Sequence, residues 1–332
     1  MRAVKIPSVP PAPYRRLAVV AAFLLGAIVV TGATVRLTSS GLGCPTWPKC
    51  TATSLVAPAS YHALVEFINR VITFLVGVFV ALVAVGSLLR APRRRDLIWL
   101  SWSLVGGFCG QAVIGGLSVI YHLDAPWVIA HFLLSMLLMW VALVLVHRAH
   151  PGWVPAAPAV RFELLWLGRL LVAVAGCVLV LGTVTTGTGP HAGSGTDVKR
   201  LPFPLERVTQ LHADSALLLT GLIVATVVAV RLTSTPSAVR RRANWLVVAV
   251  LAQVVIGYTQ YFLNLPASIV ELHVAGATIL WSVTLWMHLG YTVSAPVGSA
   301  YPAAAEQGAC PVPDAQGVGR AVKQRPVRST EF

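Results

Sequence analysis

Charged side chains are scarce in this sequence. Asp, Glu, Lys and Arg together make up 11% of the 332 residues, about half the share that a soluble globular domain carries. Hydrophobic residues make up 56%, and the mean hydropathy is +0.77. The shortage of charge excludes a soluble domain of ordinary composition and predicts an integral membrane protein.

Acidic residues are the scarcer kind. The chain has 11 Asp and Glu against 25 Lys and Arg, which leaves a formal charge of +14. A basic balance of this size can indicate nucleic-acid binding. Here, however, the basic residues cluster in loops beside apolar runs, a pattern that sets orientation in a membrane. We therefore exclude nucleic acid as a partner and predict the lipid bilayer instead.

A small-residue cleavage site is missing after the first apolar run, residues 17–35. The run is also longer than the core of a secretory signal peptide, which has about 7–15 residues. We therefore expect this segment to be retained as a helix.

Apolar runs of about 20 residues recur along the chain, and each is long enough to cross a hydrocarbon core about 30 Å thick. In lipid, backbone groups must pair within the segment, so each run predicts a helix. The predicted fold class is an all-α integral membrane protein with eight transmembrane helices, over residues 17–36, 63–88, 97–120, 127–147, 165–187, 209–230, 244–263 and 269–291.

One stretch of the sequence occurs twice. QAVIGGLSVIYHLDAPWVIAH at 111–131 returns 142 residues later as QVVIGYTQYFLNLPASIVELH at 253–273, with eight identities in 21 positions and no gap. Each copy reads as the end of one helix, an uncharged turn and the start of the next. The repeat predicts two parallel four-helix bundles, 17–147 and 165–291, related by a pseudo-twofold axis along the membrane normal. The segment 148–164 would link them in the cytoplasm.

Basic residues mark every second connection. The N-terminal segment 1–16, the loops after the second, fourth and sixth helices, and the tail 292–332 carry Arg, whereas the turns 121–126 and 264–268 have no Lys or Arg. The positive-inside rule then places both termini in the cytoplasm of a multi-pass plasma-membrane protein. The tail is rich in Pro, Ala and Gly, and we expect it to be disordered.

Three of the nine His residues, His131, His212 and His273, lie one to two turns inside the outer ends of predicted helices. An ionisable side chain roughly 5–9 Å deep, at 1.5 Å per residue, is a functional-site hypothesis by default. The alternative is a His that hydrogen-bonds a neighbouring helix. Because His212 and His273 share one depth, we interpret them as axial ligands of a haem whose carboxylates face water or loop cations. Zinc is disfavoured, since no Cys or carboxylate completes a tetrahedral set there.

The first bundle differs in one ligand position. His131 matches His273, but Asn69 stands where His212 stands. Asn is a poor haem ligand, so this half offers one good axial ligand, and a partly open site suits a substrate better than a fixed cofactor. His62 lies two turns outward of Asn69. It is either a second ligand or a residue of the membrane interface.

A carboxylate also enters the second helix. Glu66 lies one turn outward of Asn69 on the same face, and Arg70 follows at i+4. The pair is either a structural ion pair, or Glu66 stands beside the substrate to move a proton or stabilise developing positive charge. Cys44 and Cys50 lie in the first outer loop, on the oxidising side, and can form a disulfide there. That disulfide would either staple the loop or take part in redox chemistry.

These features together resemble the haem A synthase family. The resemblance covers about residues 15–290 and is carried by the two four-helix units, the outer loop SGLGCPTWPKC, the second-helix stretch Glu66-Phe67-Ile68-Asn69-Arg70, and His131, His212 and His273. The family oxidises the C8 methyl group of haem O to the formyl group of haem A, which supplies cytochrome c oxidase.

The resemblance implies roles for individual residues: haem b on His212 and His273, substrate haem O on His131, activity that depends on Glu66, and a disulfide or redox pair of Cys44 and Cys50. Many members carry His where this chain has Asn69, so the second ligand of the first site stays open. By the same resemblance, a haem O synthase and the oxidase assembly machinery are expected partners.

Two other functions compete with this interpretation. A b-type electron-transfer cytochrome would have two fixed bis-His haems, and Asn69 argues against that. A transporter for haem or a small molecule would have helices broken by Gly or Pro near the bilayer midplane. In this chain, Gly115, Gly116 and Gly257 lie near outer ends instead.

Overall fold

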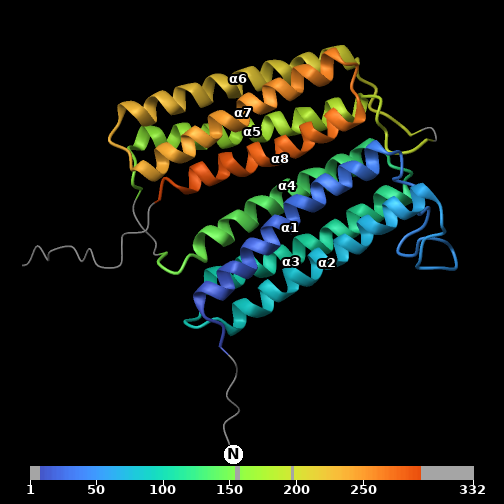
Figure 1. Ribbon diagram of the computed structural model, residues 1–332, viewed down its shortest axis with the longest axis horizontal. Coiled ribbons are helices and arrows are strands. Elements are labelled where there is room, and N and C mark those ends of the chain that lie inside the picture. Colours follow the sequence, from blue (N-terminus) through green and yellow to red (C-terminus); the bar gives the residue numbers. More distant parts are fainter. Residues whose placement is uncertain (1–7, 154–157, 196–197, 293–332) are drawn as a thin grey trace, which may run out of the picture. The chain divides into compact units, whose positions relative to one another are not determined.

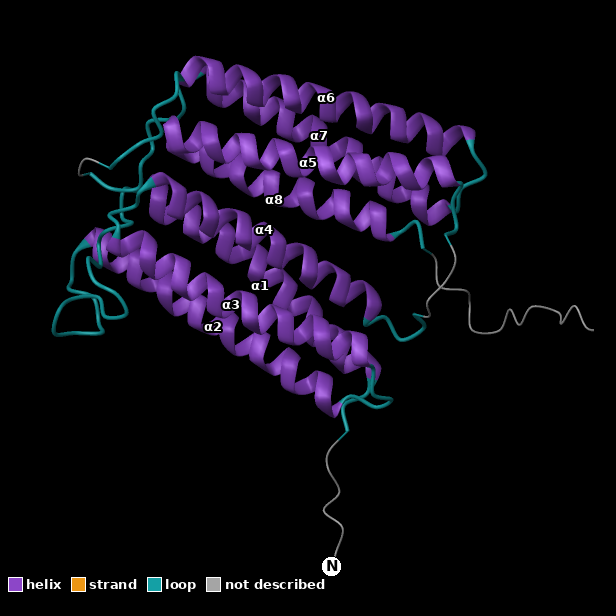
Figure 2. Ribbon diagram, turned by 180° about the vertical axis from the view of Figure 1, so that it is seen from behind, coloured by secondary structure: helices purple, strands orange, loops and turns teal. Residues whose placement is uncertain are grey.

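The computed structural model describes residues 8–153, 158–195 and 198–292, and within these ranges every regular element is an α-helix (Figure 2). The helices are α1 (Pro11–Leu37), α2 (Tyr61–Leu89), α3 (Arg95–Ile120), α4 (Ala125–Arg148), α5 (Phe162–Thr188), α6 (Leu205–Leu232), α7 (Ser237–Phe262) and α8 (Ala267–Leu289). The disorder expected for the tail falls on residues 293–332, outside the described part of the chain.

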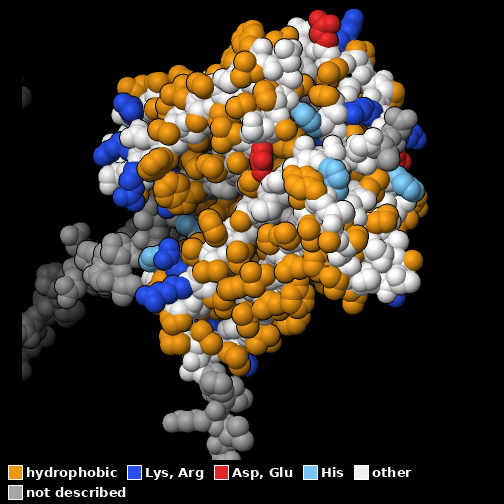
Figure 3. Space-filling view, turned by 45° about the vertical axis from the view of Figure 1, so that its right-hand side comes forward, with side chains coloured by type: hydrophobic (Ala, Val, Ile, Leu, Met, Phe, Trp, Pro, Cys, Tyr) orange, Lys and Arg blue, Asp and Glu red, His pale blue; other side chains and the backbone are white. Residues whose placement is uncertain are grey.

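All eight of these helices are long and apolar enough to cross a membrane. The predicted fold class, an all-helical multi-pass membrane protein, is therefore confirmed. Large apolar side chains such as Phe23, Phe74 and Trp99 are 74–76% exposed. Figure 3 shows apolar side chains over the helix surfaces, with Lys and Arg gathered near the helix ends. Such a surface suits lipid, which solvates apolar groups where water would not.

Two helices begin well before the apolar runs that predicted them. α1 starts at Pro11 rather than at 17, and α7 starts at Ser237 rather than at 244. Their first two turns carry basic residues such as Arg15 and Arg240, and long basic side chains allow a helix to continue past its apolar run. A search for apolar residues therefore truncates these helices at their charged ends.

The helices pack as two closed rings. α1, α2, α3 and α4 each contact the next, and α4 returns to α1; α5, α6, α7 and α8 do the same (Figure 1). The rings meet through α1–α8, α4–α5 and α4–α8. A twofold axis that exchanges α1 with α5 and α4 with α8 would turn the α1–α8 contact into the α4–α5 contact and the α4–α8 contact into itself. The contacts fit the predicted symmetry, while the axis itself stays a prediction.

We name the end of the rings that carries the α1–α2, α3–α4, α5–α6 and α7–α8 connections the outer end. The densely buried core lies away from it. Among the described residues, no side chain of α6 is buried before Leu219, none of α7 after Val250 and none of α8 before Thr278. In α2, none is buried between Glu66 and Val76. The outer parts of these four helices are thus loosely packed, and Asn69, His212 and His273 lie in them.

Candidate functional site

The imidazoles of the three predicted ligands have the same kind of neighbour. Each lies against a glycine of the preceding helix: His131 on Gly115, His212 on Gly182 and His273 on Gly257. A Cβ added to these glycines would approach Cε1 of the ring to 3.1, 3.0 and 3.4 Å, respectively. Each glycine is the 21st residue of its helix, α3, α5 or α7. The absent side chain makes room for an imidazole, and we name this arrangement a glycine cradle.

The repeated Gln holds the backbone of the repeated His. The Gln111 side-chain amide donates to the His131 carbonyl oxygen (3.1 Å), and the Gln253 amide donates to that of His273 (2.8 Å). Gln111 also donates to Ser135 Oγ at 2.6 Å. Both bonds join the last turns of one helix to the first turns of the next, so they fix the register of each hairpin and the height of its His.

His212 and His273 face one another across the second ring. Their ring centres are 6.4 Å apart and their planes cross at 80°. Metal–imidazole bonds of about 2.0–2.1 Å on either side of one ion separate two ring centres by about 6 Å. Among the described residues, no hydrogen-bond partner meets the buried Nδ1 atom of His273, and the His212 ring has the Val178 carbonyl as its nearest backbone partner. The spacing of the two imidazoles and the loose packing around them therefore fit a planar metal macrocycle between these two side chains.

The first ring lacks the fourth cradle. The 21st residue of α1 is Thr31 rather than Gly. Its hydroxyl donates to Asn69 Oδ1 at 2.8 Å. Asn69 is the ninth residue of α2 and His212 the eighth of α6, so their correspondence, expected from the sequence, stays a prediction. His131 therefore sits in a cradle, and a hydrogen-bonded Thr–Asn pair takes the place of the opposing His–Gly pair.

Glu66 is buried, with 6% of its surface exposed, and it is fully engaged with the α1–α2 loop. Oε2 accepts the Cys44 backbone amide at 2.8 Å, and Oε1 accepts Arg70 at 2.6 Å. Arg70 in turn donates to the carbonyl oxygens of Cys44, Thr46 and Lys49. The structural alternative, an ion pair, is therefore present, and it is built into the loop.

The predicted disulfide between Cys44 and Cys50 is present in that loop, and both residues are buried. Glu66 and Arg70 thus hold the backbone beside a disulfide, at the outer end of the first ring. His62 is exposed in the first turn of α2, and its Nδ1 lies 3.0 Å from Ser40 Oγ. It stands seven residues before Asn69, about 10 Å along the helix, so its role as a ligand stays a prediction.

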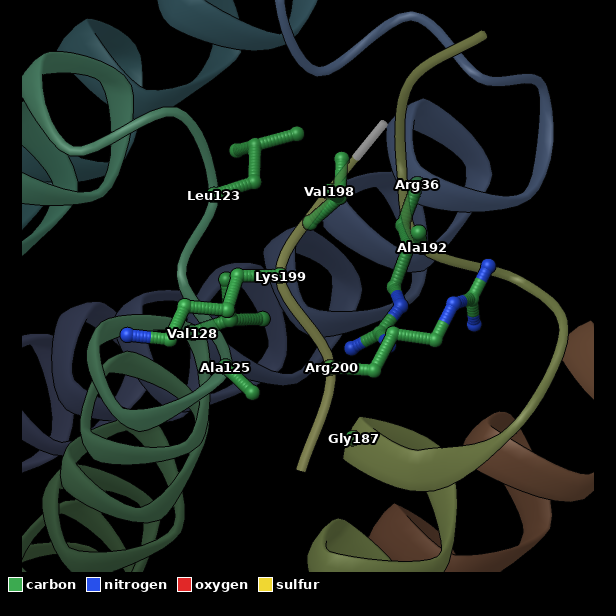
Figure 4. Close-up of a pocket in the computed structure, with 9 residues that line it drawn as sticks. All are labelled: Arg36, Leu123, Ala125, Val128, Gly187, Ala192, Val198, Lys199 and Arg200. Atoms are coloured by element: carbon green, nitrogen blue, oxygen red, sulfur yellow. The ribbon is translucent and has the colours of Figure 1, made fainter. Parts of the chain in front are cut away.

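A cationic pocket lies at the outer end, between the last turns of α1 and α5 and the first turn of α4 (Figure 4). Arg36 crosses from the first ring to the second, donating to the His191 and Thr186 carbonyl oxygens at 2.7 and 2.9 Å. Arg200 and Lys199 complete the basic lining, and no described lining residue is acidic. Sequence reasoning missed this pocket, although an Arg ending an apolar helix and a Lys-Arg pair were visible signals.

A second feature was also missed. Glu271 of α8 accepts a hydrogen bond from Thr34 of α1, and Trp281 Nε1 donates to the Met136 carbonyl oxygen at 3.0 Å. Both bonds join the two rings. The available signal was a lone carboxylate inside an apolar run, which is rare in a membrane helix unless it is paired or functional.

The fold and the site together define a class: an all-helical, multi-pass membrane protein whose half-buried histidines sit in glycine cradles near one end of its bundles. A family model described as cytochrome oxidase assembly protein matches residues 15–62 and 56–285. The chain therefore belongs to that family.

Curated relatives carry a more specific name. The chain is 32% identical over 112 residues to "Heme A synthase" of Geobacillus kaustophilus (strain HTA426), a stretch that covers 33% of this chain and 35% of the relative. It is 30% identical over 136 residues to that of Geobacillus thermodenitrificans, covering 40% and 42%. For Halalkalibacterium halodurans the values are 24% over 157 residues, covering 47% and 53%. The chain thus spans between a third and about half of these relatives' lengths.

Proposed function

We propose that this chain is a haem A synthase, which oxidises the C8 methyl group of haem O to the formyl group of haem A for cytochrome c oxidase. Family membership and the names of the relatives support this reaction. The observation that carries the proposal is the difference between the rings. One has two opposed histidines, and the other has one His opposite Asn69. The rival electron-transfer cytochrome would have two fixed bis-His haems, and Asn69 in the first ring argues against that.

In the second ring, His212 and His273 would hold haem b as a resident cofactor from its two sides. Their spacing of 6.4 Å supports this assignment. The glycine cradles and the Gln253 hydrogen bond orient the imidazoles, so that little ordering is left for the moment of binding. Haem b bound there supplies a one-electron redox centre.

In the first ring, His131 would hold the substrate haem O. Gly115 makes room for the His131 imidazole, and Gln111 holds the His131 backbone at its height. Gly257 and Gln253 do the same for His273. His62 is the alternative source of a second ligand, at the price of breaking its contact with Ser40. Haem carries two carboxylates, and the cationic pocket at the outer end supplies donors for such groups. Val128, which lines this pocket, lies one turn outward of His131 on α4.

Glu66 would support the reaction from the outer end of the first ring. Its carboxylate positions the Cys44 amide and Arg70. These contacts favour a role in shaping the disulfide loop, which lies at the outer end of the proposed substrate site. The direct role predicted from the sequence, moving a proton or stabilising positive charge, requires one carboxylate oxygen to leave these partners. The disulfide that Glu66 anchors would either staple this loop or take part in the redox chemistry.

The proposed setting is the plasma membrane, with both termini in the cytoplasm and the glycine cradles near the opposite face. The two rings would be parallel repeats, with 17–147 as the substrate half and 165–291 as the haem b half. A haem O synthase would supply the substrate, and oxidase assembly factors would take the product.

Pigment analysis of the purified protein tests the proposal. The protein is expressed with and without a haem O source, and its haems are extracted and separated by chromatography. We expect haem B in both samples, and haem A or a hydroxylated intermediate only with haem O. Haem B alone in both would favour the b-type cytochrome. Protein free of any haem would overturn the ligand assignments and favour a transporter.

A further inference from the structure

We infer that Thr31 is the residue that keeps the first ring open: it closes the fourth cradle to a histidine and holds Asn69 there instead. The inference rests on the proposed haem sites and deepens them. It names the pair of positions that separates a haem site with one cradled imidazole from a site with two.

Four positions, one on each of α1, α3, α5 and α7, have the same number along their helices. The 21st residue of α3, α5 and α7 is a glycine under a His ring, and the 21st residue of α1 is Thr31, which contacts Asn69. α1 and α5 both have 27 residues, so Thr31 and Gly182 also lie equally far from the outer ends of their helices. Thr31 is therefore the counterpart of Gly182.

A side chain at this position crowds an imidazole, and a larger side chain crowds it more. At Gly182 a single added Cβ would stand 3.0 Å from Cε1 of His212, inside ordinary van der Waals contact. Threonine brings a Cβ and two further heavy atoms, and its branched side chain has few rotamers with which to withdraw. A His placed at position 69 could not take the pose of His212 while Thr31 is present.

Asn69 fits because it is short and polar. Its Oδ1 accepts the Thr31 hydroxyl, so the amide oxygen is turned toward α1. His131 is then the one cradled imidazole of the first ring, and the face of the haem opposite His131 is left to an exchangeable small molecule. The Thr31–Asn69 pair thus selects a site that holds haem from one side.

The test exchanges the two pairs between the rings. Asn69→His, Thr31→Gly and the double variant are purified with their haem, together with the reciprocal Gly182→Thr/His212→Asn variant. The readouts are the low-spin signal in electron paramagnetic resonance and the amount of carbon monoxide bound by the reduced protein. Neither readout depends on enzymatic turnover.

We expect the wild type to bind about one carbon monoxide per haem-loaded first site, because distal access decides such binding. Asn69→His alone should still bind it. The Thr31→Gly/Asn69→His double variant should gain a second low-spin haem and lose most of its carbon monoxide binding. The reciprocal variant should open the second ring and lose the low-spin signal of its haem.

Three results would overturn the inference: a closed site in Asn69→His alone, an open site in the double variant, or a haem-loaded wild type that binds no carbon monoxide. The last would point to a second ligand such as His62. A wild type that never contains haem would overturn the proposed function itself, and the inference with it. Should the double variant fail to fold, the reciprocal variant in the second ring decides the question.

Discussion

The two rings share a scaffold and differ in what they place at its outer end. The second ring opposes His212 and His273 across 6.4 Å, each in a glycine cradle. The first ring repeats the cradle once, at His131, and has Thr31 and Asn69 at the other place. Thr31 and Asn69 are thus the two positions at which the first ring departs from the proposed pair of opposed ligands in the second.

The outer loops widen this difference. The α1–α2 loop has a disulfide, and the Glu66–Arg70 pair holds it against the first ring. Counted from His212 as these residues are from Asn69, the corresponding positions of α6 are Thr209 and Ala213. The second ring thus has no counterpart of this ion pair. The ring with the open ligand position is also the ring with a polar, cross-linked loop above it.

Removal of a cradled His should show the largest difference between the two rings. We expect His273→Ala to lose nearly all haem B from the purified protein, because one of two opposed ligands is gone; loss of even an orienting partner costs about 10–100-fold in metal affinity. His131→Ala should keep haem B and lose haem A formation. Pyridine haemochrome spectra measure both contents.

His150→Ala is the matched control, since this His is exposed at the opposite end of the helices. It should leave both haem contents unchanged. Equal loss of haem B in His131→Ala and His273→Ala would contradict the assignment of different tasks to the two rings.

Glu66→Gln should affect only the first ring. The substitution keeps the size of the side chain but removes the charge that pairs with Arg70, and breaking a buried pair can cost about 3–5 kcal/mol. The cost here should be smaller, since Arg70 keeps its bonds to loop carbonyls. We expect haem A output to fall about tenfold or more, roughly 1.4 kcal/mol in the barrier, with haem B unchanged. Chromatography of extracted pigments measures both.

The exposed pair Arg161–Glu163 supplies the control, because its charges face solvent and such pairs contribute little. Glu163→Gln should leave haem A output unchanged. If Glu66→Gln were equally silent, Glu66 would have no part in the mechanism.

Much of the comparison was visible in the sequence. The gapless repeat aligned Gln111 with Gln253 and His131 with His273, and helical periodicity then fixed the depth of each His. The hydrophobic runs located all eight described helices, since length and apolarity alone decide what spans a bilayer. Asn69 could be compared with His212 because both lie nearly the same distance before the repeated Gln.

The contacts between helices were not predictable. The sequence shows that Gln111 recurs as Gln253, but its bond to a His carbonyl depends on how two helices pack side by side. Thr31 could not be matched to Asn69, because a long loop separates α1 from α2 and leaves their register open. The role of Glu66 as an anchor for the Cys44 amide depends on how that same loop folds back.

Filling the glycine cradle of His212 should weaken haem binding in the second ring alone. Gly182→Ala places a Cβ 3.0 Å from His212 Cε1, and overpacking of this kind typically costs about 1–3 kcal/mol. We expect haem B affinity to fall about tenfold while His131 keeps its substrate. Haem transfer to a soluble acceptor protein measures the affinity.

Gly176→Ala is the control in the same helix, because a Cβ there meets nothing within 4 Å. It should leave haem transfer unchanged and raise thermal stability slightly, by about 0.5–1 kcal/mol, as Ala replaces Gly in a helix. A larger loss of haem in Gly176→Ala than in Gly182→Ala would contradict the cradle.

The repeated Gln should give the smallest effect and the finest comparison. Gln253→Leu removes one hydrogen bond to the His273 carbonyl, worth about 1 kcal/mol, so haem B should leave about fivefold faster. Gln111→Leu removes the matching bond and a second one to Ser135, and it should weaken only the first ring. Because each Gln ties its own hairpin, each variant should change one haem and spare the other. A variant that loosened both haems equally would mean that the interface between the rings, rather than the hairpin, sets the height of the His.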